Sequence, residues 1–288
     1  MQYRALLEAS AKQVGNIACM GLDPQRESLP LDSGDLRTDV NAFFQQLFRR
    51  MVLSGLIPAA FKPNIGYYQS LDKPREEDFS GSLALVDVLD LVENFFPGIP
   101  VILDSKRGDI ARSSLNYAQE AFDAWACDAV TVAPYMGSDS VKPFTDFEDK
   151  GVYILNRTSN PGGRDLQNLL LSDQRPLYLE VASQIAAYND RRGCVGAVVG
   201  ATNLDELRSI AAFYQAQRVP MLIPGVGSQG GSATEVMEIL RTTGYPLVLA
   251  RINSSSALTH PWKQGPVPED WLEICEANLR QLIMETAL

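Results

Sequence analysis

The sequence predicts a single (β/α)8 TIM barrel, an α/β fold in which one domain spans residues 1–288. Eight short apolar runs rich in β-branched residues recur along the chain. Each run is followed by a segment with helical periodicity rather than by a hairpin turn. No Ser/Gly-rich linker, charge block or change in composition marks the start of a second domain. A chain of this length is ordinary for one barrel.

The apolar runs place the expected strands at 17–23, 59–64, 101–106, 129–135, 152–159, 196–201, 221–226 and 247–252. Amphipathic stretches between them predict helices at 40–56, 83–96, 111–126, 177–192, 203–216 and 233–243. A doubly wound open sheet has the same alternation, but it would gather its functional residues at one switch point. Here nearly every run ends in polar residues or in Gly or Pro, which favours a barrel with functional groups at all its strand ends.

The composition is that of a globular protein, with 45% hydrophobic and 21% charged residues, and it excludes a disordered chain or a disulfide-built scaffold. Lys and Arg total 25 against 35 Asp and Glu, which gives a formal net charge of −10. Such a charge argues against nucleic acid as a partner. A small anionic substrate remains compatible, because a local cluster of basic residues can bind one phosphate.

The four cysteines lie far apart without a CxxC pair, no apolar signal stretch opens the chain, and no run reaches the roughly 18–20 apolar residues of a membrane span. We therefore expect a cytoplasmic protein without a membrane contact. The single histidine, His260, argues against a His-based metal site or catalytic triad. Because His260 precedes Pro261 in an expected loop, we predict that it lies on the surface.

Charged residues end two neighbouring expected strands. The third strand runs into Asp104-Ser105-Lys106-Arg107-Gly108-Asp109, and Asp104 and Lys106 share one face because side chains alternate along an extended chain. The second strand ends in Lys62. Opposite charges that surround one another stay ionised even when partly buried. A salt bridge that only caps the barrel would use the same residues, but this network suits a reaction that develops negative charge on carbon.

These charges resemble the mark of the orotidine 5′-monophosphate decarboxylase family, which is Asp-x-Lys-x-x-Asp at the third strand with a Lys at the end of the second. Asp104, Lys106, Asp109 and Lys62 match all four positions. The resemblance, to the longer bacterial-type branch, continues through Gly21-Leu22-Asp23-Pro24, Phe61-Lys62-Pro63, Pro134-Tyr135-Met136-Gly137, Arg157-Thr158-Ser159-Asn160-Pro161-Gly162 and Pro224-Gly225-Val226-Gly227-Ser228-Gln229-Gly230-Gly231. Ala133 departs from the family, where an Asn often precedes the Pro-Tyr pair.

The resemblance implies an enzyme that decarboxylates orotidine 5′-monophosphate to UMP in pyrimidine biosynthesis, without a cofactor or a metal ion. It implies that Lys106 is the proton donor. Lys62, Asp104 and Asp109 would complete the charged network around the reacting carbon. Loss of CO2 from C6 of the pyrimidine leaves a carbanion that the ring π-system cannot delocalise, so a fixed ammonium group would stabilise the charge and then protonate C6.

The resemblance also implies a homodimer with shared active sites, since the family sends Asp109 and the residues after it across the interface. Ile110 and Ser113 would therefore bind substrate in the partner's site. Asp23 would contact the ribose. Ser159 matches the residue that hydrogen-bonds the pyrimidine ring, although its Ser/Asn/Pro/Gly setting alone indicates only a turn.

The phosphate would bind beside the glycine-rich segment 225–231, whose backbone amides can approach an anion closely. The resemblance assigns the phosphate contacts to Gln229 and Arg251. Arg251 as a rim salt bridge is the structural alternative. A shift of the last strand would instead put the phosphate arginine at Ser256, and the arginine would then be missing.

Two other functions share these features. A 3-keto-L-gulonate 6-phosphate decarboxylase or a hexulose phosphate synthase has the same Asp-x-Lys-x-x-Asp motif. Such relatives resemble one another in using magnesium and an acidic group near the second strand, where this chain has Lys62, and a lysine would repel that metal. A non-catalytic nucleotide-binding barrel is the third possibility, which the intact charged motif argues against.

Overall fold

Eight parallel strands form one sheet in the computed structural model, which describes residues 1–189, 194–227, 229–263 and 265–288. The strands are β1 (Ala18–Gly21), β2 (Ala60–Lys62), β3 (Ile102–Arg107), β4 (Ala129–Val132), β5 (Gly151–Arg157), β6 (Val195–Val199), β7 (Met221–Pro224) and β8 (Ala250–Ser254). Their order is β2-β1-β8-β7-β6-β5-β4-β3. Parallel bridges from Phe61 to Val101 and from Asn64 to Asp104 join the two outer strands. The sheet therefore closes into the predicted barrel.

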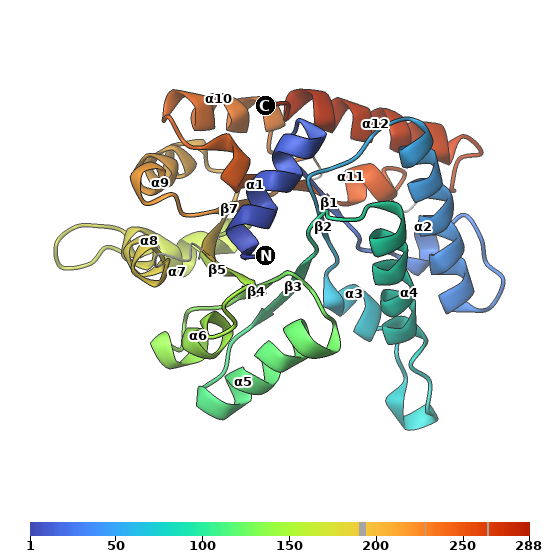
Figure 1. Cartoon of the computed structure of the whole chain (residues 1–288), viewed down its shortest axis with the longest axis horizontal. Helices are drawn as coiled ribbons and strands as arrows, with labels where there is room; N and C mark the ends of the chain where they lie inside the picture. Colours follow the sequence, from blue (N-terminus) through green and yellow to red (C-terminus); the bar gives the residue numbers. More distant parts are fainter. Residues whose placement is uncertain (190–193, 228, 264) are drawn as a thin grey trace.

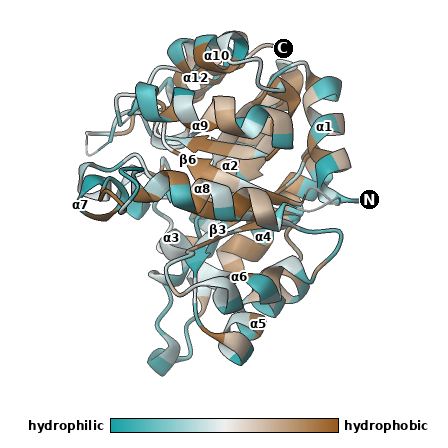
Figure 2. Ribbon diagram, turned by 90° about the vertical axis from the view of Figure 1, so that its left-hand side faces the viewer, coloured by the Kyte–Doolittle hydropathy of each residue, from teal (hydrophilic) through white to brown (hydrophobic). Residues whose placement is uncertain are grey.

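Helices surround the barrel and turn their apolar faces toward the strands (Figures 1 and 2). The long ones are α1 (Tyr3–Val14), α2 (Leu36–Leu53), α4 (Ser80–Phe95), α5 (Ala111–Gln119), α6 (Ser138–Thr145), α8 (Leu177–Tyr188), α9 (Leu204–Gln217), α10 (Ala233–Thr242) and α12 (Trp271–Glu285). Shorter helices are α3 (Ile65–Gln69), α7 (Arg164–Gln167) and α11 (Ser256–Thr259). No predicted helix covers α1, α3, α6, α7, α11 or α12.

All eight predicted strands and six predicted helices are present, with differences at their ends. The difference that matters for the site concerns the last strand, predicted at 247–252. Leu247–Leu249 form a 3-10 turn instead, and β8 begins at Ala250 and ends at Ser254. The end of the last strand therefore lies beyond Arg251. Helix 177–192 is described only as far as Tyr188, and its last predicted residues, 190–192, lie outside the described residues.

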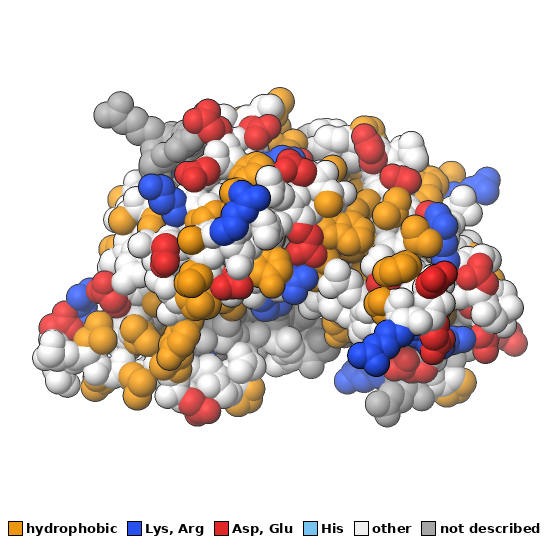
Figure 3. Space-filling view, turned by 90° about the horizontal axis from the view of Figure 1, so that it is seen from below, with side chains coloured by type: hydrophobic (Ala, Val, Ile, Leu, Met, Phe, Trp, Pro, Cys, Tyr) orange, Lys and Arg blue, Asp and Glu red, His pale blue; other side chains and the backbone are white. Residues whose placement is uncertain are grey.

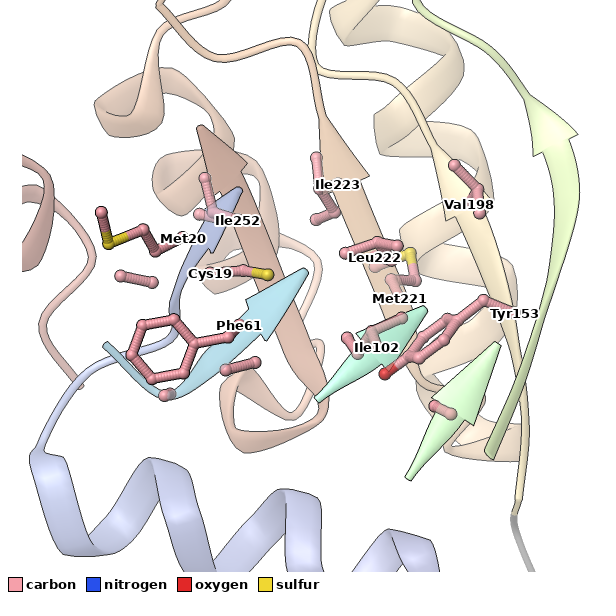
Figure 4. Packing of buried hydrophobic residues seen from close by; sticks show 14 of the residues in the cluster. Cys19, Met20, Phe61, Ile102, Tyr153, Val198, Met221, Leu222, Ile223 and Ile252 are labelled. Carbon is pink, nitrogen blue, oxygen red and sulfur yellow. The ribbon is translucent and has the colours of Figure 1, made fainter. Parts of the chain in front are cut away.

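Buried side chains pack on both faces of the strands (Figure 4). Leu222 and Tyr153 point into the barrel, whereas Phe61 packs outward against Phe48 of α2 and against Phe96. Helix α1 covers the end of the barrel at which the strands begin. The Tyr3 hydroxyl donates to the Tyr153 hydroxyl at 3.0 Å. A Cβ at Gly151 would lie 2.4 Å from the Tyr3 ring, so only glycine admits this contact. One end of the barrel is thus sealed, and a ligand must enter at the other.

The surface carries acidic and basic side chains that are interspersed rather than sorted by sign on the face seen in Figure 3. None of the helices in the described ranges is long and apolar enough to cross a membrane. All four cysteines are buried.

Candidate active site

A cavity of about 530 Å³ opens at the end of the barrel where the strands finish. Six of the ten predicted site residues line it: Asp23, Lys62, Asp104, Lys106, Ser159 and Gln229. They follow or end β1, β2, β3, β5 and β7, whose C-terminal ends meet at one rim. The prediction that these side chains share one site is therefore consistent with the fold.

Two lysines bind one carboxylate on the β2–β3 side of the cavity. Lys62 Nζ donates to Asp104 Oδ2 at 2.7 Å, and Lys106 Nζ donates to Asp104 Oδ1 at 2.5 Å. The Lys62 and Asp104 side chains are buried, whereas the Lys106 side chain is 46% exposed. Lys106 therefore presents its ammonium group to the cavity while Asp104 holds it in place.

Thr131 on β4 orients this cluster, a role that the sequence pattern did not indicate. Its hydroxyl donates to Asp104 Oδ1 at 2.9 Å and accepts from the backbone N–H groups of Ser105 and Lys106. The register of β3 shifts between Leu103 and Arg107, and Lys106 has φ 48°. A non-glycine residue in this left-handed region is strained and persists only when neighbouring contacts fix it. Here Thr131 supplies those contacts.

Charge pairing keeps the buried members of the cluster ionised. Burial alone would lower the pKa of Lys62, but the Asp104 and Asp23 carboxylates outweigh it and raise that pKa. Burial alone would raise the pKa of Asp104, but Lys62 and Lys106 outweigh it and lower that pKa. The site therefore offers a fixed carboxylate between two fixed cations near neutral pH.

Asp23 is held at the end of β1 by neighbours from two other elements. Its Oδ1 accepts from the backbone N–H of Asn64 at 2.9 Å, and its Oδ2 accepts from the Ser255 hydroxyl at 2.6 Å. Gly21 makes room for Ser255, because a Cβ at Gly21 would lie 2.4 Å from the Ser255 Cβ. The buried carboxylate keeps lone pairs on the cavity side, where it can accept hydrogen bonds from hydroxyl groups.

Ser159 and Gln229 meet on the opposite side of the cavity. The Ser159 hydroxyl donates to Gln229 Oε1 at 2.6 Å and so joins the loops that follow β5 and β7. Gly200 and Gly225 allow this approach, since a Cβ at Gly200 would lie 2.6 Å from the Ser159 backbone N. Gly225 has φ 102°, a conformation that favours glycine.

Comparison with known proteins identifies the family. A family model described as the orotidine 5′-phosphate decarboxylase / HUMPS family matches residues 19–241. The chain belongs to this family. A protein of Cupriavidus necator named orotidine 5′-phosphate decarboxylase is 37% identical over 260 residues, which are 90% of either chain. A protein of Bordetella pertussis with the same name is 37% identical over 285 residues, or 98% of this chain and 97% of that one. The solved structure of Leishmania donovani OMP decarboxylase matches with a TM-score of 0.76 and 30% identity over 99% of each chain.

Arg251 does not reach the cavity, so the structure contradicts its predicted role in binding phosphate. It is the second residue of β8, and its side chain is completely buried at the sealed end of the barrel. Its guanidinium donates to five neutral oxygen atoms: the backbone O atoms of Leu7, Ala59, Val248 and Ala250, and Ser10 Oγ. The strand that continues to Ser254 puts Ser255 and Ser256 at the cavity instead. The position that a family arginine would occupy after the shift is thus a serine.

His260 lies at the cavity, so our prediction that it lies on the surface is wrong. It is only 4% exposed, because helix α11 turns the chain back toward the barrel mouth. Nδ1 lies 2.8 Å from Thr259 Oγ1, and Nε2 has no hydrogen-bond partner among the described residues. Asn253, another residue that the sequence did not single out, also lines the cavity with an unpartnered Oδ1.

Asp109, Ile110 and Ser113 lie outside this chain's cavity. Asp109 Oδ1 accepts from the backbone N–H of Ile110 at 2.7 Å. Ile110 is 51% exposed, and Ser113 is exposed at the start of α5. The structure therefore does not bring Asp109 to Lys62, Asp104 and Lys106 within one chain.

Proposed function

We propose that this chain decarboxylates orotidine 5′-monophosphate to UMP in de novo pyrimidine biosynthesis. The observation that carries the proposal is the Lys62–Asp104–Lys106 cluster, with donor distances of 2.7 and 2.5 Å, in a cavity large enough for a nucleotide. Family membership and the names of the relatives support the same activity. We also propose one domain for the whole chain and a cytoplasmic location.

The reaction needs a group that stabilises negative charge on C6 and then donates a proton to it. The C6–carboxylate bond breaks, CO2 leaves, and the electron pair stays on C6. Lys106 Nζ then gives its proton to C6 and becomes a neutral amine, which regains a proton from water through its exposed side. An ammonium group that is fixed before the reaction stabilises the developing charge without having to reorganise.

Asp104 and Lys62 keep that ammonium in place and charged. Asp104 accepts one hydrogen bond from each lysine and a third from Thr131, so its position is defined from three strands. Lys62 compensates the charge of Asp104, which would otherwise be costly to bury. We propose that Lys62, Asp104 and Lys106 act as one preorganised unit.

The remaining cavity residues would position the nucleotide. Asp23 accepts hydrogen bonds from the ribose hydroxyl groups, and Ser159 hydrogen-bonds the pyrimidine ring. Gln229 binds the phosphate together with backbone amides of the loop after β7. The Ser159–Gln229 hydrogen bond of 2.6 Å supports this assignment, because the base and the phosphate contacts would then be adjacent.

A sugar-phosphate lyase or synthase of the same family would need a magnesium site near the end of β2. Lys62 occupies that end, and its ammonium group would repel a divalent cation. In the described parts of the chain, no group of three or more His, Cys, Asp and Glu side chains is placed to hold a metal. The lysine at the end of β2 favours the nucleotide decarboxylase.

We further propose a homodimer in which Asp109 completes the partner's charged network, with Ile110 and Ser113 beside the partner's substrate. The exposed apolar side chains of Ile110, Tyr135 and Met136 support an interface on this side of the barrel.

Complementation between two variants tests the shared sites. Lys106→Ala and Asp109→Ala should each be inactive alone. After subunit exchange in an equal mixture, about a quarter of the parent activity should return, because half of the dimers are mixed and each has one intact site. Confirmed exchange without activity would contradict shared sites.

The activity itself is tested by the change in ultraviolet absorbance as orotidine 5′-monophosphate becomes UMP. We expect rapid conversion that survives prolonged EDTA treatment. Binding of UMP without conversion of the substrate would instead indicate a non-catalytic nucleotide-binding barrel. Loss of activity that magnesium restores would favour the sugar-phosphate alternative.

A further inference from the structure

The two sides of the cavity differ in charge. The described lysine and arginine side chains that line it are Lys62 and Lys106, and both are engaged with Asp104 on the β2–β3 side. The side formed by the loop after β7 and the segment after β8 presents amides, hydroxyl groups and His260. Arg164 lies in an adjoining hollow, where its Nη2 donates to Asn203 Oδ1 at 3.3 Å. A nucleotide's phosphate would therefore meet few positive charges at this end.

His260 is placed to meet a ligand there. Ser256 and His260 both line the cavity, and their spacing of four residues puts them on one face of the turn that α11 forms. This turn packs on the loop after β7, because a Cβ at Gly227 would lie 3.1 Å from Ala257 Cβ. The His260 ring is buried, yet its Nε2 has no partner among the described residues. A buried polar atom without a partner is costly unless a ligand or water satisfies it.

The contacts of Thr259 indicate which ring nitrogen carries the proton. Its hydroxyl has one hydrogen, which it donates to the backbone O of Ser255 at 3.2 Å. The hydroxyl can then only accept from His260, so Nδ1 carries the hydrogen of the 2.8 Å contact. In the neutral ring Nε2 is therefore an acceptor. It cannot donate to a phosphate oxygen until it gains a proton.

We propose that His260 binds the phosphate of the nucleotide through Nε2 and takes up a proton from solvent when it does so. The inference rests on the proposed function, because it assumes a nucleotide in this cavity. The proton forms the Nε2–H bond, and the resulting imidazolium donates to a phosphate oxygen. His260 would thereby supply the positive charge that Arg251, at the sealed end of the barrel, does not.

The surroundings of His260 agree with a proton that arrives with the ligand. Burial lowers the pKa of His260, and the nearby Asp23 and Glu27 carboxylates offset this only in part. Lys263, one turn further on, is exposed at the surface. The free protein thus holds the ring neutral near pH 7, and a dianion at Nε2 would raise the pKa because it favours the charged form. Phosphate binding and protonation should be coupled.

The chain's single histidine makes a direct test possible. In NMR titrations of tag-free protein, the imidazole signals belong to His260 without further assignment. We expect the His260 pKa to rise by at least about one unit when UMP is bound, and to change little when uridine is bound. Equal titration curves for the free and UMP-bound protein would overturn the proposal, and so would the same rise with uridine.

Comparison of the parent protein with one variant, His260→Gln, gives an independent measurement. His260→Gln keeps a hydrogen-bonding group but cannot become a cation, so UMP binding should weaken about 10- to 100-fold at pH 7, the range of one charge-assisted hydrogen bond. Uridine binding should change less than about twofold, since no charge is involved. Calorimetry in buffers of different ionisation enthalpy should detect proton uptake with UMP in the parent and less in the variant. Protons that the UMP phosphate itself gains or loses contribute equally to both measurements, so the difference between the two proteins reports on His260.

A gain-of-function control protects the test against misfolding. Ser256→Arg in the His260→Gln background places a permanent cation in the same cavity, and it should restore UMP affinity without restoring proton uptake. Unchanged UMP affinity in folded His260→Gln would overturn the proposal. A different result would contradict the proposed function alone: the parent protein would bind UMP with proton uptake but would not decarboxylate orotidine 5′-monophosphate.

Discussion

Two buried cations at opposite ends of the barrel are satisfied in different ways. Lys62 lies at the open end and donates to the Asp104 carboxylate at 2.7 Å, next to the exposed ammonium of Lys106. Arg251 lies at the sealed end and donates only to neutral oxygen atoms of α1, of β8 and of the segments before β2 and β8. Both side chains are almost completely buried. Burial of a charge therefore does not by itself identify a catalytic residue.

The difference lies in what the partners can do. A carboxylate that two lysines share holds an ammonium group beside a cavity, where it can act on a ligand. The Arg251 guanidinium instead donates to carbonyl oxygens and so joins α1 to the strands. Its N–H groups are used in these bonds, and none is left to bind a ligand. We expect the open end to control activity and the sealed end to control stability.

The largest expected effect follows from Lys106→Ala at the open end. This change removes both the proton donor and a cation next to C6, so kcat should fall by roughly 10⁴-fold or more, the upper range for loss of a general acid. The fold should persist because the side chain is half exposed. Steady-state kinetics and the thermal unfolding midpoint check both statements. Turnover within tenfold of the parent would remove Lys106 from the mechanism.

Arg251→Met tests the sealed end. The free energy of unfolding should decrease by roughly 2–4 kcal/mol, because buried carbonyl groups that lose a donor cost about 1–3 kcal/mol each. Ser10 would still donate to the backbone O of Leu7 and of Ala59, which limits the loss. Denaturant unfolding measures the change. The ratio of UMP to uridine affinity should stay as in the parent, and a selective loss of UMP binding would contradict the structural role of Arg251.

Thr131→Val sharpens the account of the open end, because it removes one hydroxyl at nearly constant shape. Asp104 and two backbone N–H groups lose a partner, so Lys106 should be held less firmly. We expect kcat to fall about 10-fold, which corresponds to the free energy of about one hydrogen bond, with little change in UMP affinity. Thr131→Ser, which keeps the hydroxyl, is the matched control and should retain most of the activity.

The smallest expected effect concerns pH. The lowered pKa of Asp104 means that its contribution to stability is complete above the unfolded value of about 4 and is lost as the pH falls through the lower folded pKa. The raised pKa of Lys62 means that its contribution is complete below the unfolded value of about 10.4. The difference in free energy of unfolding between the parent and Asp104→Asn should therefore stay constant from about pH 5 to 9 and shrink below about pH 4. A difference that grows in acid would contradict the pairing.

The sequence was sufficient for the barrel and for the charged side of its cavity. Apolar runs with intervening helices predict parallel strands, and polar residues at nearly every strand end favour a barrel, in which those residues meet at one rim. It failed at β8, where Leu247–Leu249 have the composition of a strand but form a 3-10 turn after Pro246. A shift of a few residues moved Arg251 from the rim to the sealed end, since side-chain position depends on where a strand begins.

His260 and Thr131 were missed for a different reason. The direction of the His260 side chain depends on how the short helix α11 packs against the loop after β7, which no one-dimensional pattern records. Thr131 looks like any β-branched residue of a buried strand. Its role arises from the irregular pairing of β3 with β4, which brings two backbone N–H groups and Asp104 to one hydroxyl.

The most direct test of the central claim, that Lys106 exchanges a proton with C6 at the open end, uses the product alone. A group that delivers a proton to C6 in decarboxylation must also be able to remove one from UMP, although slowly. Incubation of UMP with the parent protein in D2O, followed by NMR, should therefore replace hydrogen by deuterium at C6. Lys106→Ala, which still binds UMP, should lose this exchange, whereas Arg251→Met should keep it. Exchange at the parent rate in Lys106→Ala would contradict the account.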